Sequence, residues 1–329
     1  MDTTRLITVF GGSGFVGRHV VRTLALDGWR IRVASRRPEL AFFLPTLGTA
    51  GQICTVQANM RYPDSVAAAM RGAQAVVNLT GILAPSGRQT FDGIHRFGAA
   101  ALADAAKAAK ITNLVHVSAI GADPNAASAY ARSKAEGEAA VLETVPSAVI
   151  ARPSLVFGPE DDFFNRFAAM ARLFPALPLI GGGHTKFQPV YVGDVAKFIA
   201  KAAAGQVTSG TVYELGGPEI KTFHELLAYI CEVTGRRRLL APMPFGLASL
   251  MARSTEIAGA LSLGLFPPML AMTRDQVTLL KSDNIVSGAA LADKRTLQGV
   301  GIEPETIAAI VPTYLARFRR TGQFAVSGA

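Results

Sequence analysis

The feature that most constrains the fold is a regular alternation of short apolar runs and alanine-rich segments through the first half of the chain. The alanine-rich segments have helical periodicity, as at residues 94–110 and 133–143. The runs between them are apolar throughout, which is typical of strands buried on both faces of a parallel sheet. Six runs are expected to be strands: Leu6–Phe10, Ile31–Ala34, Ile53–Gln57, Ala75–Leu79, Leu114–Val117 and Ala148–Ala151. Because crossovers between parallel strands are right-handed, the pattern predicts an α/β fold, a doubly wound parallel sheet of the Rossmann type.

The regular alternation weakens after about Pro153. Proline and glycine become frequent, as in LPLIGGGH, LGGP and FPPM, and short helical and strand-like pieces follow one another unevenly. The sequence therefore predicts a Rossmann domain at residues 1–152 and a smaller, irregular α/β lobe at residues 153–329 that binds a substrate or a partner. We expect segments of this second part to interleave with the first domain.

The composition is that of a well-packed globular protein, with 50% hydrophobic and 17% charged residues in a chain of 329. The net charge of +9 predicts attraction to anions, but it does not distinguish nucleotides, acidic membrane surfaces and nucleic acids. The basic segment ARFRRTGQF near the C-terminus has no aromatic residues interleaved in a stacking pattern. We therefore expect no nucleic-acid partner.

Cysteine and histidine usage narrows the function further. Cys54 and Cys231 lie far apart and match no metal or redox spacing, and no histidine has ligand spacing either. The sequence thus predicts no metal site. The opening MDTTR leads directly into an apolar run, without the order of charged, apolar and small residues that marks a signal peptide. These features favour a reducing, cytoplasmic location.

A glycine-rich turn, GGSGFVG, follows the first apolar run and opens the first helix. Gly11 allows a sharp turn, Gly14 leaves room for a pyrophosphate beside the backbone, and Gly17 lets the helix pack closely on the strand. A helix that begins near Phe15 points free N–H groups and the positive end of its dipole at the phosphates. At the first strand of an alternating α/β pattern, this spacing predicts a dinucleotide-binding site.

The residues after the second apolar run indicate which dinucleotide is preferred. An NAD site usually has Asp or Glu there to bind the ribose hydroxyls. This chain has Ser35, Arg36 and Arg37, and the first acidic residue is Glu39. A guanidinium group forms charge-assisted, often bidentate hydrogen bonds with a 2′-phosphate. The sequence therefore predicts a preference for NADP(H), with NAD(H) as the alternative.

A second set of residues points to acid–base chemistry. Ser118 follows the fifth apolar run, and twelve residues later YARSK places Tyr130 and Lys134 four positions apart. On a helix these two side chains share one face. An ammonium group close to a phenol stabilises its phenolate form, which general acid–base work at neutral pH requires. Ser118 is expected to hydrogen-bond a substrate oxygen, and Lys134 to hold the nicotinamide ribose as well.

These motifs resemble the extended or atypical short-chain dehydrogenase/reductase superfamily. The resemblance rests on GGSGFVG, on NLTG at residues 78–81, on the Ser118, Tyr130 and Lys134 set, and on ARPSLVFGPED. A narrower resemblance, to the NAD(P)H-binding accessory subunit of respiratory complex I and its bacterial relatives, rests on four stretches of the second half. They are RPSLVFGPEDDFFNRF, FQPVYVGDVAKFI, ELGGPEIKTFHELL and TRDQVTLLKSDNIV. The resemblance covers nearly the whole chain.

The superfamily resemblance implies a Rossmann fold, a bound nicotinamide dinucleotide, a C-terminal substrate lobe, and catalytic roles for Ser118, Tyr130 and Lys134. The predicted cofactor-binding residues are Gly11, Ser13, Gly14, Phe15, Val16, Gly17, Ser35, Arg36, Arg37, Asn59, Met60, Leu79, Thr80, Gly81, Tyr130, Lys134, Pro153 and Ser154. In two places the chain departs from the usual pattern. His95 stands where extended epimerases usually have the asparagine that supports the active-site helix, and Asn59 stands where many members bind adenine through Asp.

Two interpretations of function follow from these resemblances. The first is an NADP(H)-dependent oxidoreductase, or an epimerase- or dehydratase-like enzyme, that acts on an unidentified small molecule with a carbonyl or hydroxyl group. The second is a non-catalytic subunit or assembly factor that holds the cofactor as a structural element of a complex I-type NADH:quinone oxidoreductase. The narrower resemblance implies the second, since turnover is not established for that group.

A long apolar stretch after Arg236–Arg238 bears on partners. Residues 239–272 include Arg253, Glu256 and several prolines, so they are a poor transmembrane span. They are compatible with a place on a partner protein or at the inner face of a membrane, with the arginines near anionic headgroups. We favour the alternative that they cover the substrate cleft and pack on the core of their own lobe.

Overall fold

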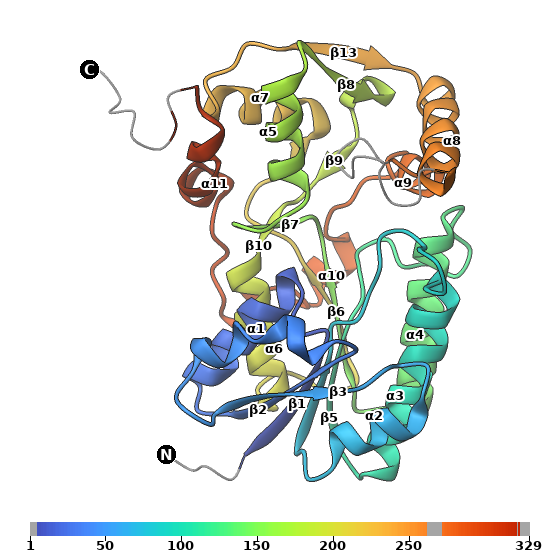
Figure 1. The fold of residues 1–329 in the computed structure, drawn as a ribbon, viewed down its shortest axis with the longest axis vertical. Helices are drawn as coiled ribbons and strands as arrows, with labels where there is room; N and C mark the ends of the chain where they lie inside the picture. The colour runs from blue at the N-terminus through green and yellow to red at the C-terminus, as the bar shows by residue number, and fades with distance from the viewer. Residues whose placement is uncertain (1–4, 262–271, 321, 323–329) are drawn as a thin grey trace. The chain divides into compact units, whose positions relative to one another are not determined.

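A computed structural model describes residues 5–261, 272–320 and 322, and it divides the chain into two compact units (Figure 1). The first unit consists of the chain up to Pro153 together with Val192–Leu215 and Val286–Pro304. The second consists of Ser154–Tyr191, Gly216–Ile285 and the chain from Glu305 onward. Two segments that follow residue 153 in the sequence, Val192–Leu215 and Val286–Pro304, thus belong to the first unit.

The core of the first unit is a seven-stranded parallel sheet in the order β11-β6-β5-β4-β1-β2-β3. Its strands are β1 (Leu6–Phe10), β2 (Arg30–Ser35), β3 (Ile53–Gln57), β4 (Ala75–Asn78), β5 (Asn113–Val117), β6 (Val149–Pro153) and β11 (Val212–Leu215). The first six confirm the predicted runs, and the fold is the predicted Rossmann type. The seventh strand was not predicted, because VYEL carries a glutamate in a run of four residues and so lacks the apolar signal of the others.

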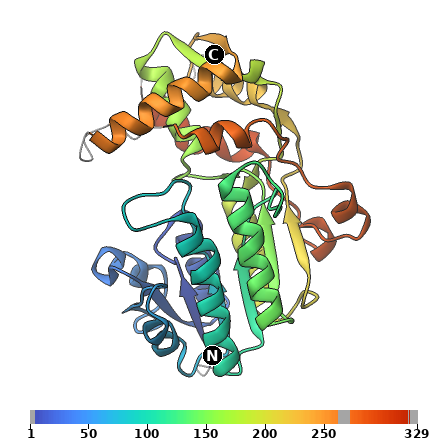
Figure 2. The same ribbon diagram turned by 90° about the vertical axis from the view of Figure 1, so that its right-hand side faces the viewer.

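Helices cover both faces of this sheet (Figure 2). The helix α1 (Phe15–Leu26) packs on α6 (Val192–Ala203) on one side, and α2 (Pro63–Met70), α3 (Phe97–Ala108) and α4 (Ala129–Thr144) pack in sequence on the other. Beneath the second group lies a buried apolar cluster that includes Phe10, Val76 and Leu102. Short 3₁₀ turns, η1 (Pro38–Ala41) and η2 (Leu44–Leu47), follow β2, and a π-helical turn, η3 (Asp92–Arg96), precedes α3. The returning segment after residue 285 forms α10 (Gly288–Ala292) and the turn η6 (Gln298–Val300).

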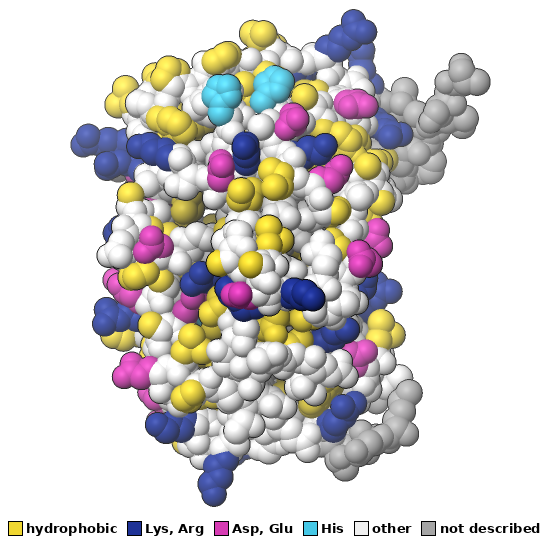
Figure 3. All heavy atoms as spheres, turned by 180° about the vertical axis from the view of Figure 1, so that it is seen from behind, with side chains coloured by type: hydrophobic (Ala, Val, Ile, Leu, Met, Phe, Trp, Pro, Cys, Tyr) yellow, Lys and Arg dark blue, Asp and Glu magenta, His cyan; other side chains and the backbone are white. Residues whose placement is uncertain are grey.

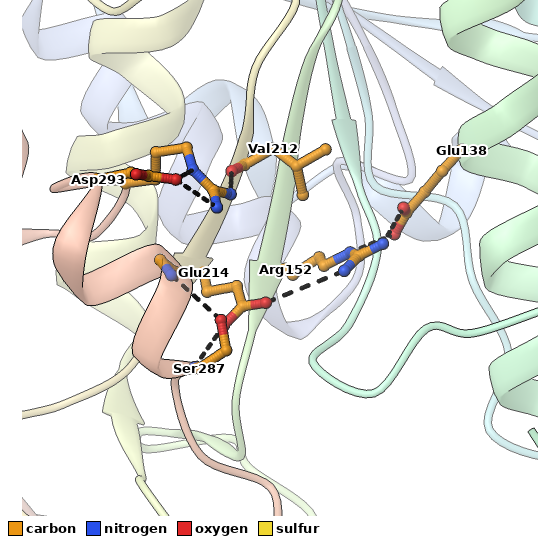
Figure 4. A network of polar contacts seen from close by, with 8 residues as sticks. Glu138, Arg152, Val212, Glu214, Ser287 and Asp293 are labelled. Carbon is orange, nitrogen blue, oxygen red and sulfur yellow. Dashed lines mark hydrogen bonds and ion pairs between the residues drawn. The ribbon is translucent and has the colours of Figure 1, made fainter.

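A buried ion pair ties the returning segments to the sheet (Figure 4). Arg152 on β6 donates from Nε and Nη2 to the two carboxylate oxygens of Glu138 on α4, at 2.9 and 2.6 Å. Its Nη1 lies 3.9 Å from Glu214 Oε1 on β11, and the other oxygen of Glu214 accepts the backbone N–H of Ser287 at 2.7 Å. One guanidinium group therefore joins the helix that carries Tyr130 and Lys134 to two strands and to the segment before α10.

The second unit is built from short strand pairs and helices, as the uneven sequence pattern predicts. The strand pairs are β7 (Val156–Phe157) with β10 (Val190–Tyr191), β9 (Lys186–Phe187) with β12 (Lys221–Thr222), and β8 (Ala176–Ile180) with β13 (Leu239–Met243). Its helical segments are α5 (Phe163–Leu173), η4 (Gly181–Gly183), α7 (Phe223–Val233), α8 (Phe245–Leu261), α9 (Arg274–Leu279), α11 (Ile307–Leu315) and η7 (Ala316–Phe318).

An aromatic cluster forms the core of the second unit. The rings of Phe157 and Phe164 meet edge to face with centroids 5.9 Å apart, and Phe167 packs against Phe223 at 5.6 Å. Beside it the buried Asp161 accepts the hydroxyl of Tyr314 at 2.6 Å and the N–H of Phe164 at the start of α5. The carboxylate thus fixes α11 and the first turn of α5 to one another.

The apolar stretch at residues 239–272 forms β13 and α8, and its residues 262–271 lie outside the described part of the chain. Among the helices that the structure describes, none combines the length and the apolarity needed to cross a bilayer. On the face shown in Figure 3, hydrophobic side chains are scattered among charged ones over the described surface.

Candidate functional site

The glycine-rich turn between β1 and α1 has the geometry expected of a phosphate-binding turn. Gly11 has φ +78, and a Cβ there would lie 3.0 Å from the carbonyl carbon of Leu79. A Cβ on Gly17 would lie 2.3 Å from the carbonyl oxygen of Gly11, so only glycine fits. At Gly14 the nearest atom to such a Cβ, also the Gly11 oxygen, lies at an ordinary 3.4 Å. Protein packing explains the first and third glycines but does not require the second, which is consistent with the predicted approach of a pyrophosphate at Gly14.

The helix α1 begins directly at this turn. Gly14 is its N-cap residue, and no side chain caps the helix there. Ser13, Phe15 and Val16 surround that N-terminus and are all partly exposed. Uncapped N–H groups at a helix N-terminus are the donors that a pyrophosphate uses. The turn therefore fits the phosphates of a dinucleotide.

The two arginines predicted to select the cofactor are exposed just after β2. Arg36 and Arg37 form no ion pair within the described residues, and the N–H of Arg37 is held by Ser35 Oγ at 3.3 Å. Arg32 on the same strand differs, since its Nη1 donates to the carbonyls of Ala69 and Arg71. Within the described residues, the guanidinium groups of Arg36 and Arg37 make no contacts comparable to those of Arg32. This fits the prediction that they bind a ligand.

Two residues after β3 are placed differently from one another. Asn59 uses its side-chain oxygen to accept the N–H of Arg61 at 3.1 Å, in an Asx turn. Met60 is only 8% exposed and packs in the apolar cluster under α3, against Gly98. The side chain of Met60 is thus a core group, and only its backbone is available to a cofactor.

The loop after β4 lies against the glycine turn. The N–H of Leu79 donates to the carbonyl of Phe10 at 2.9 Å, and Asn78 Oδ1 accepts the N–H of Thr80 at 3.0 Å. Gly81 lies beside the ammonium group of Lys134, because a Cβ on Gly81 would be 3.3 Å from Lys134 Nζ. Leu79, Thr80 and Gly81 therefore occupy the space between the phosphate turn and the predicted acid–base residues.

Lys134 is buried on α4 with its charge largely uncompensated. Its Nζ donates to the carbonyl of Val117 at 3.1 Å, immediately before Ser118. Burial lowers the pKa of Lys134 to about 8, and the attraction of Glu138 opposes this shift. Glu138 is itself held by Arg152, so it gives the ammonium group only part of the support of an ion pair.

Ser118 follows the residue whose carbonyl accepts from this ammonium group, and the Tyr130 ring lies near the same group. The Ser118 hydroxyl is buried, and none of the described residues offers it a hydrogen-bond partner. Lys134 Nζ lies 6.0 Å from the centroid of the partly exposed Tyr130 ring. A buried hydroxyl without a partner costs about 1 to 3 kcal/mol, so it is normally matched by a bound group. The structure thus brings the three predicted catalytic residues to the carboxyl end of β5.

His95 occupies the predicted asparagine position and makes the supporting contacts. Its Nε2 accepts the N–H of Ile82 at 3.0 Å, and its Nδ1 lies 2.9 Å from Ser133 Oγ on α4. Burial, and then the charges of Lys134 and His116, lower the pKa of His95 to about 3. The ring is therefore neutral. The imidazole thus joins the loop after β4 to α4, the helix that carries Tyr130.

Sequence reasoning missed a second neutral histidine. His116 is fully buried on β5, where burial and Lys134 lower its pKa to about 3, and its Nδ1 accepts from Asn78 Nδ2 at 3.0 Å. Asn78 in turn orients the loop through Thr80. The available signal was Asn78 and His116, one polar residue in each of two adjacent apolar strands. A buried polar side chain requires a hydrogen-bond partner.

The last two predicted residues stand at the boundary of the units. Pro153 ends β6, and its carbonyl accepts the N–H of Ile120 at 3.0 Å. Ser154 begins the second unit, and its hydroxyl lies 2.6 Å from Asn284 Oδ1 and 2.8 Å from the Asn284 carbonyl oxygen. That hydroxyl is engaged within its own unit. A cofactor contact at Ser154 remains a prediction.

The parallel sheet, the glycine turn and the Ser–Tyr–Lys set define the class: a Rossmann-fold protein of the short-chain dehydrogenase/reductase type that binds a nicotinamide dinucleotide. The family model described as "NAD dependent epimerase/dehydratase family" matches residues 7–216, and the chain belongs to that family.

Known proteins similar to this chain include a respiratory-complex subunit and a reductase. It is 34% identical to "NADH dehydrogenase [ubiquinone] 1 alpha subcomplex subunit 9, mitochondrial" of Arabidopsis thaliana, over 96% of this chain and 78% of the relative. It is 34% identical to "Ceramide reductase" of Caulobacter vibrioides, over 54% of this chain and 55% of the relative.

Among solved structures, the NADPH-dependent quinone oxidoreductase QOR2 of Escherichia coli, complexed with NADPH, superposes with a TM-score of 0.69. The identity is 20%, and the match covers 94% of this chain and 99% of the other. At this identity the similarity establishes the fold alone.

The unpartnered hydroxyl predicts the effect of Ser118→Ala. Because the substitution removes a buried group that has no hydrogen bond, we expect the free energy of unfolding of the cofactor-free protein to rise by about 1 kcal/mol. The control is Ser128→Ala, which removes an equally buried hydroxyl that caps α4 by accepting the N–H of Ala131. That change should lower stability by about 1 kcal/mol. If urea unfolding shows that Ser118→Ala and Ser128→Ala lower the stability equally, the Ser118 hydroxyl is not without a hydrogen-bond partner.

The buried ammonium group predicts a pH-dependent difference between the wild type and Lys134→Met. Below pH 8 Lys134 is protonated in both folded and unfolded chains, and the fold bears the full cost of burying the charge. Between about pH 8 and 10.5 the unfolded chain binds more protons, so wild-type stability rises with pH relative to the variant. The rise should total about 3 kcal/mol. Urea unfolding of both proteins well below and well above pH 8 measures this rise. A stability difference between the wild type and Lys134→Met that does not change with pH would refute the prediction.

Proposed function

We propose that this protein binds NADP(H) and acts as an oxidoreductase on the carbonyl or hydroxyl group of a small molecule. The observation that carries the proposal is the buried, unpartnered hydroxyl of Ser118 beside the buried ammonium group of Lys134. A site built only for structure satisfies its buried polar groups internally. Ser118 Oγ has no such partner within the described residues, and we assign it to an oxygen atom of a bound ligand.

Each of the three residues has a distinct task in this proposal. The Tyr130 phenol exchanges a proton with the substrate oxygen, and the Lys134 ammonium group stabilises its phenolate form. Ser118 Oγ–H donates a hydrogen bond to the same substrate oxygen and polarises the carbonyl. Arg36 and Arg37 hold the 2′-phosphate that distinguishes NADP from NAD. A bound nicotinamide supplies the hydride chemistry.

A second candidate function is supported by the comparison over nearly the whole chain. The subunit-9 relative matches both units, whereas the ceramide reductase match spans only about half of each protein. The protein would then hold NADP(H) as a stabilising element within a respiratory NADH:quinone oxidoreductase, at the inner face of a membrane.

An arginine cluster on the second unit fits such a partner. Partial burial, followed by the charges of Arg238, Arg172 and Arg320, lowers the pKa of Arg236. Two of these arginines cap helix ends, since Arg236 donates to the Phe318 carbonyl and Arg238 to the Ala171 carbonyl. None of the four arginines forms an ion pair within the described residues. An anionic surface of a protein or membrane would relieve their mutual repulsion.

Tyr130→Phe separates the two functions. With a panel of carbonyl substrates, the wild type should oxidise NADPH, and the variant should lose at least about 100-fold in kcat while its Kd for NADPH changes less than about twofold. Stoichiometric NADPH that survives dialysis and is not oxidised by any substrate would instead favour the subunit role. Equal turnover by the two proteins would refute the mechanism.

The cofactor preference predicts the effect of Arg36→Ala combined with Arg37→Ala. Loss of two charge-assisted contacts should raise the Kd for NADPH by roughly tenfold to a hundredfold and leave the Kd for NADH unchanged, as measured by fluorescence titration. Arg30→Ala is the matched control, since Arg30 is also exposed and lies at the opposite end of β2. A parallel loss of NADH affinity in the double variant would show that the arginines do not read the 2′-phosphate.

A further inference from the structure

His95 forms a two-sided hydrogen-bonded bridge whose direction can be assigned. Ser133 Oγ donates its one hydrogen to the carbonyl oxygen of Tyr130, at 2.8 Å. The Nδ1 of His95, 2.9 Å from the same Oγ, must therefore be the donor in that contact. Since Nε2 accepts the N–H of Ile82, the neutral ring carries its proton on Nδ1. The bridge runs from the loop after β4, through the imidazole, to the residue expected to exchange the proton.

Packing holds the bridge rigid. The ring of His95 meets the Tyr130 ring edge-on at 5.4 Å and stacks on Phe91 at 5.6 Å. The π-helical turn η3, which carries His95, lies so close to α4 that their backbones touch. A Cβ on Gly137 would lie 2.1 Å from the His95 carbonyl oxygen. Such π-helical turns occur frequently at functional sites. Both the ring and the backbone of Tyr130 are thus fixed by one side chain.

We propose that His95 is a positioning residue with two separable tasks: through Ser133 it sets Tyr130, and through Ile82 it sets the loop that lies between the glycine turn and Lys134. The Tyr130 task rests on the proposed oxidoreductase function, whereas the loop task requires only that the cofactor binds beside Leu79–Gly81. The neutral state suits both tasks, because an imidazolium would lose its contact with the Ile82 N–H and would repel the ammonium group of Lys134.

Two variants test the tasks separately. In His95→Asn the amide nitrogen stands near the place of Nδ1 and keeps the donor to Ser133, but nothing reaches Ile82. In His95→Gln the amide oxygen stands near the place of Nε2 and keeps the acceptor for Ile82, but Ser133 loses its donor. Both lose the ring contact with Tyr130 equally. His95→Asn should therefore raise the Kd for NADPH roughly tenfold more than His95→Gln, and His95→Gln should lower kcat roughly tenfold more than His95→Asn.

Two further readouts do not depend on turnover. Nitrogen-15 NMR of the histidines should show His95 with its proton on Nδ1 and without titration across the neutral range. Hydrogen exchange should accelerate at residues 79–83 in His95→Asn and at residues 129–134 in His95→Gln. If the wild type has no activity on any carbonyl, the proposed function fails, and these readouts still decide the role of His95. A proton on Nε2, or indistinguishable effects of the two variants, would overturn the inference.

Discussion

The burial of one ammonium group organises the site. Lys134 lies almost fully inside the first unit, where its Nζ donates to the carbonyl of Val117. Burial, and then the nearby charge of Lys134, lowers the pKa of His95 and of His116 to about 3, so both rings are neutral. Their neutrality in turn lets each ring accept one hydrogen bond, from Ile82 or from Asn78. Two neutral imidazole rings close to the ammonium group of Lys134 thus hold the loop beside the glycine turn.

Much of this arrangement could be predicted from the sequence. Strands buried on both faces leave continuous apolar runs, and a glycine required by backbone contact leaves a fixed spacing, so the sheet and the GxxGxxG turn were both recognisable. Ser118, Tyr130 and Lys134 were recognisable because a strand end and an i, i+4 pair on a helix place them together. These features depend on local geometry, which the sequence records directly.

The remaining features depend on contacts between distant segments. Arg152, Glu214 and Ser287 come from three parts of the chain, and no local pattern brings them together. The role of His95 depends on which ring nitrogen carries the proton, and this is set by Ser133 and Ile82 rather than by sequence neighbours. Met60 is predicted to contact the cofactor, and its side chain fills the space beside Gly98, so that prediction now concerns its backbone. The direction in which a side chain points is set by its packing partners, which the local sequence does not name.

The Arg152 network stands where the chain passes from one unit to the other. The chain passes between the two units five times, after Pro153, Tyr191, Leu215, Ile285 and Pro304. Arg152, Glu214 and Ser287 each stand within two residues of one of these crossings, and they are joined to one another. In the second unit, the residues beside the crossings are joined as well, Ser154 to Asn284 and Gln188 to Gly217. Local unfolding at the crossing beside Arg152 should therefore also release the contacts that hold the crossings beside Glu214 and Ser287.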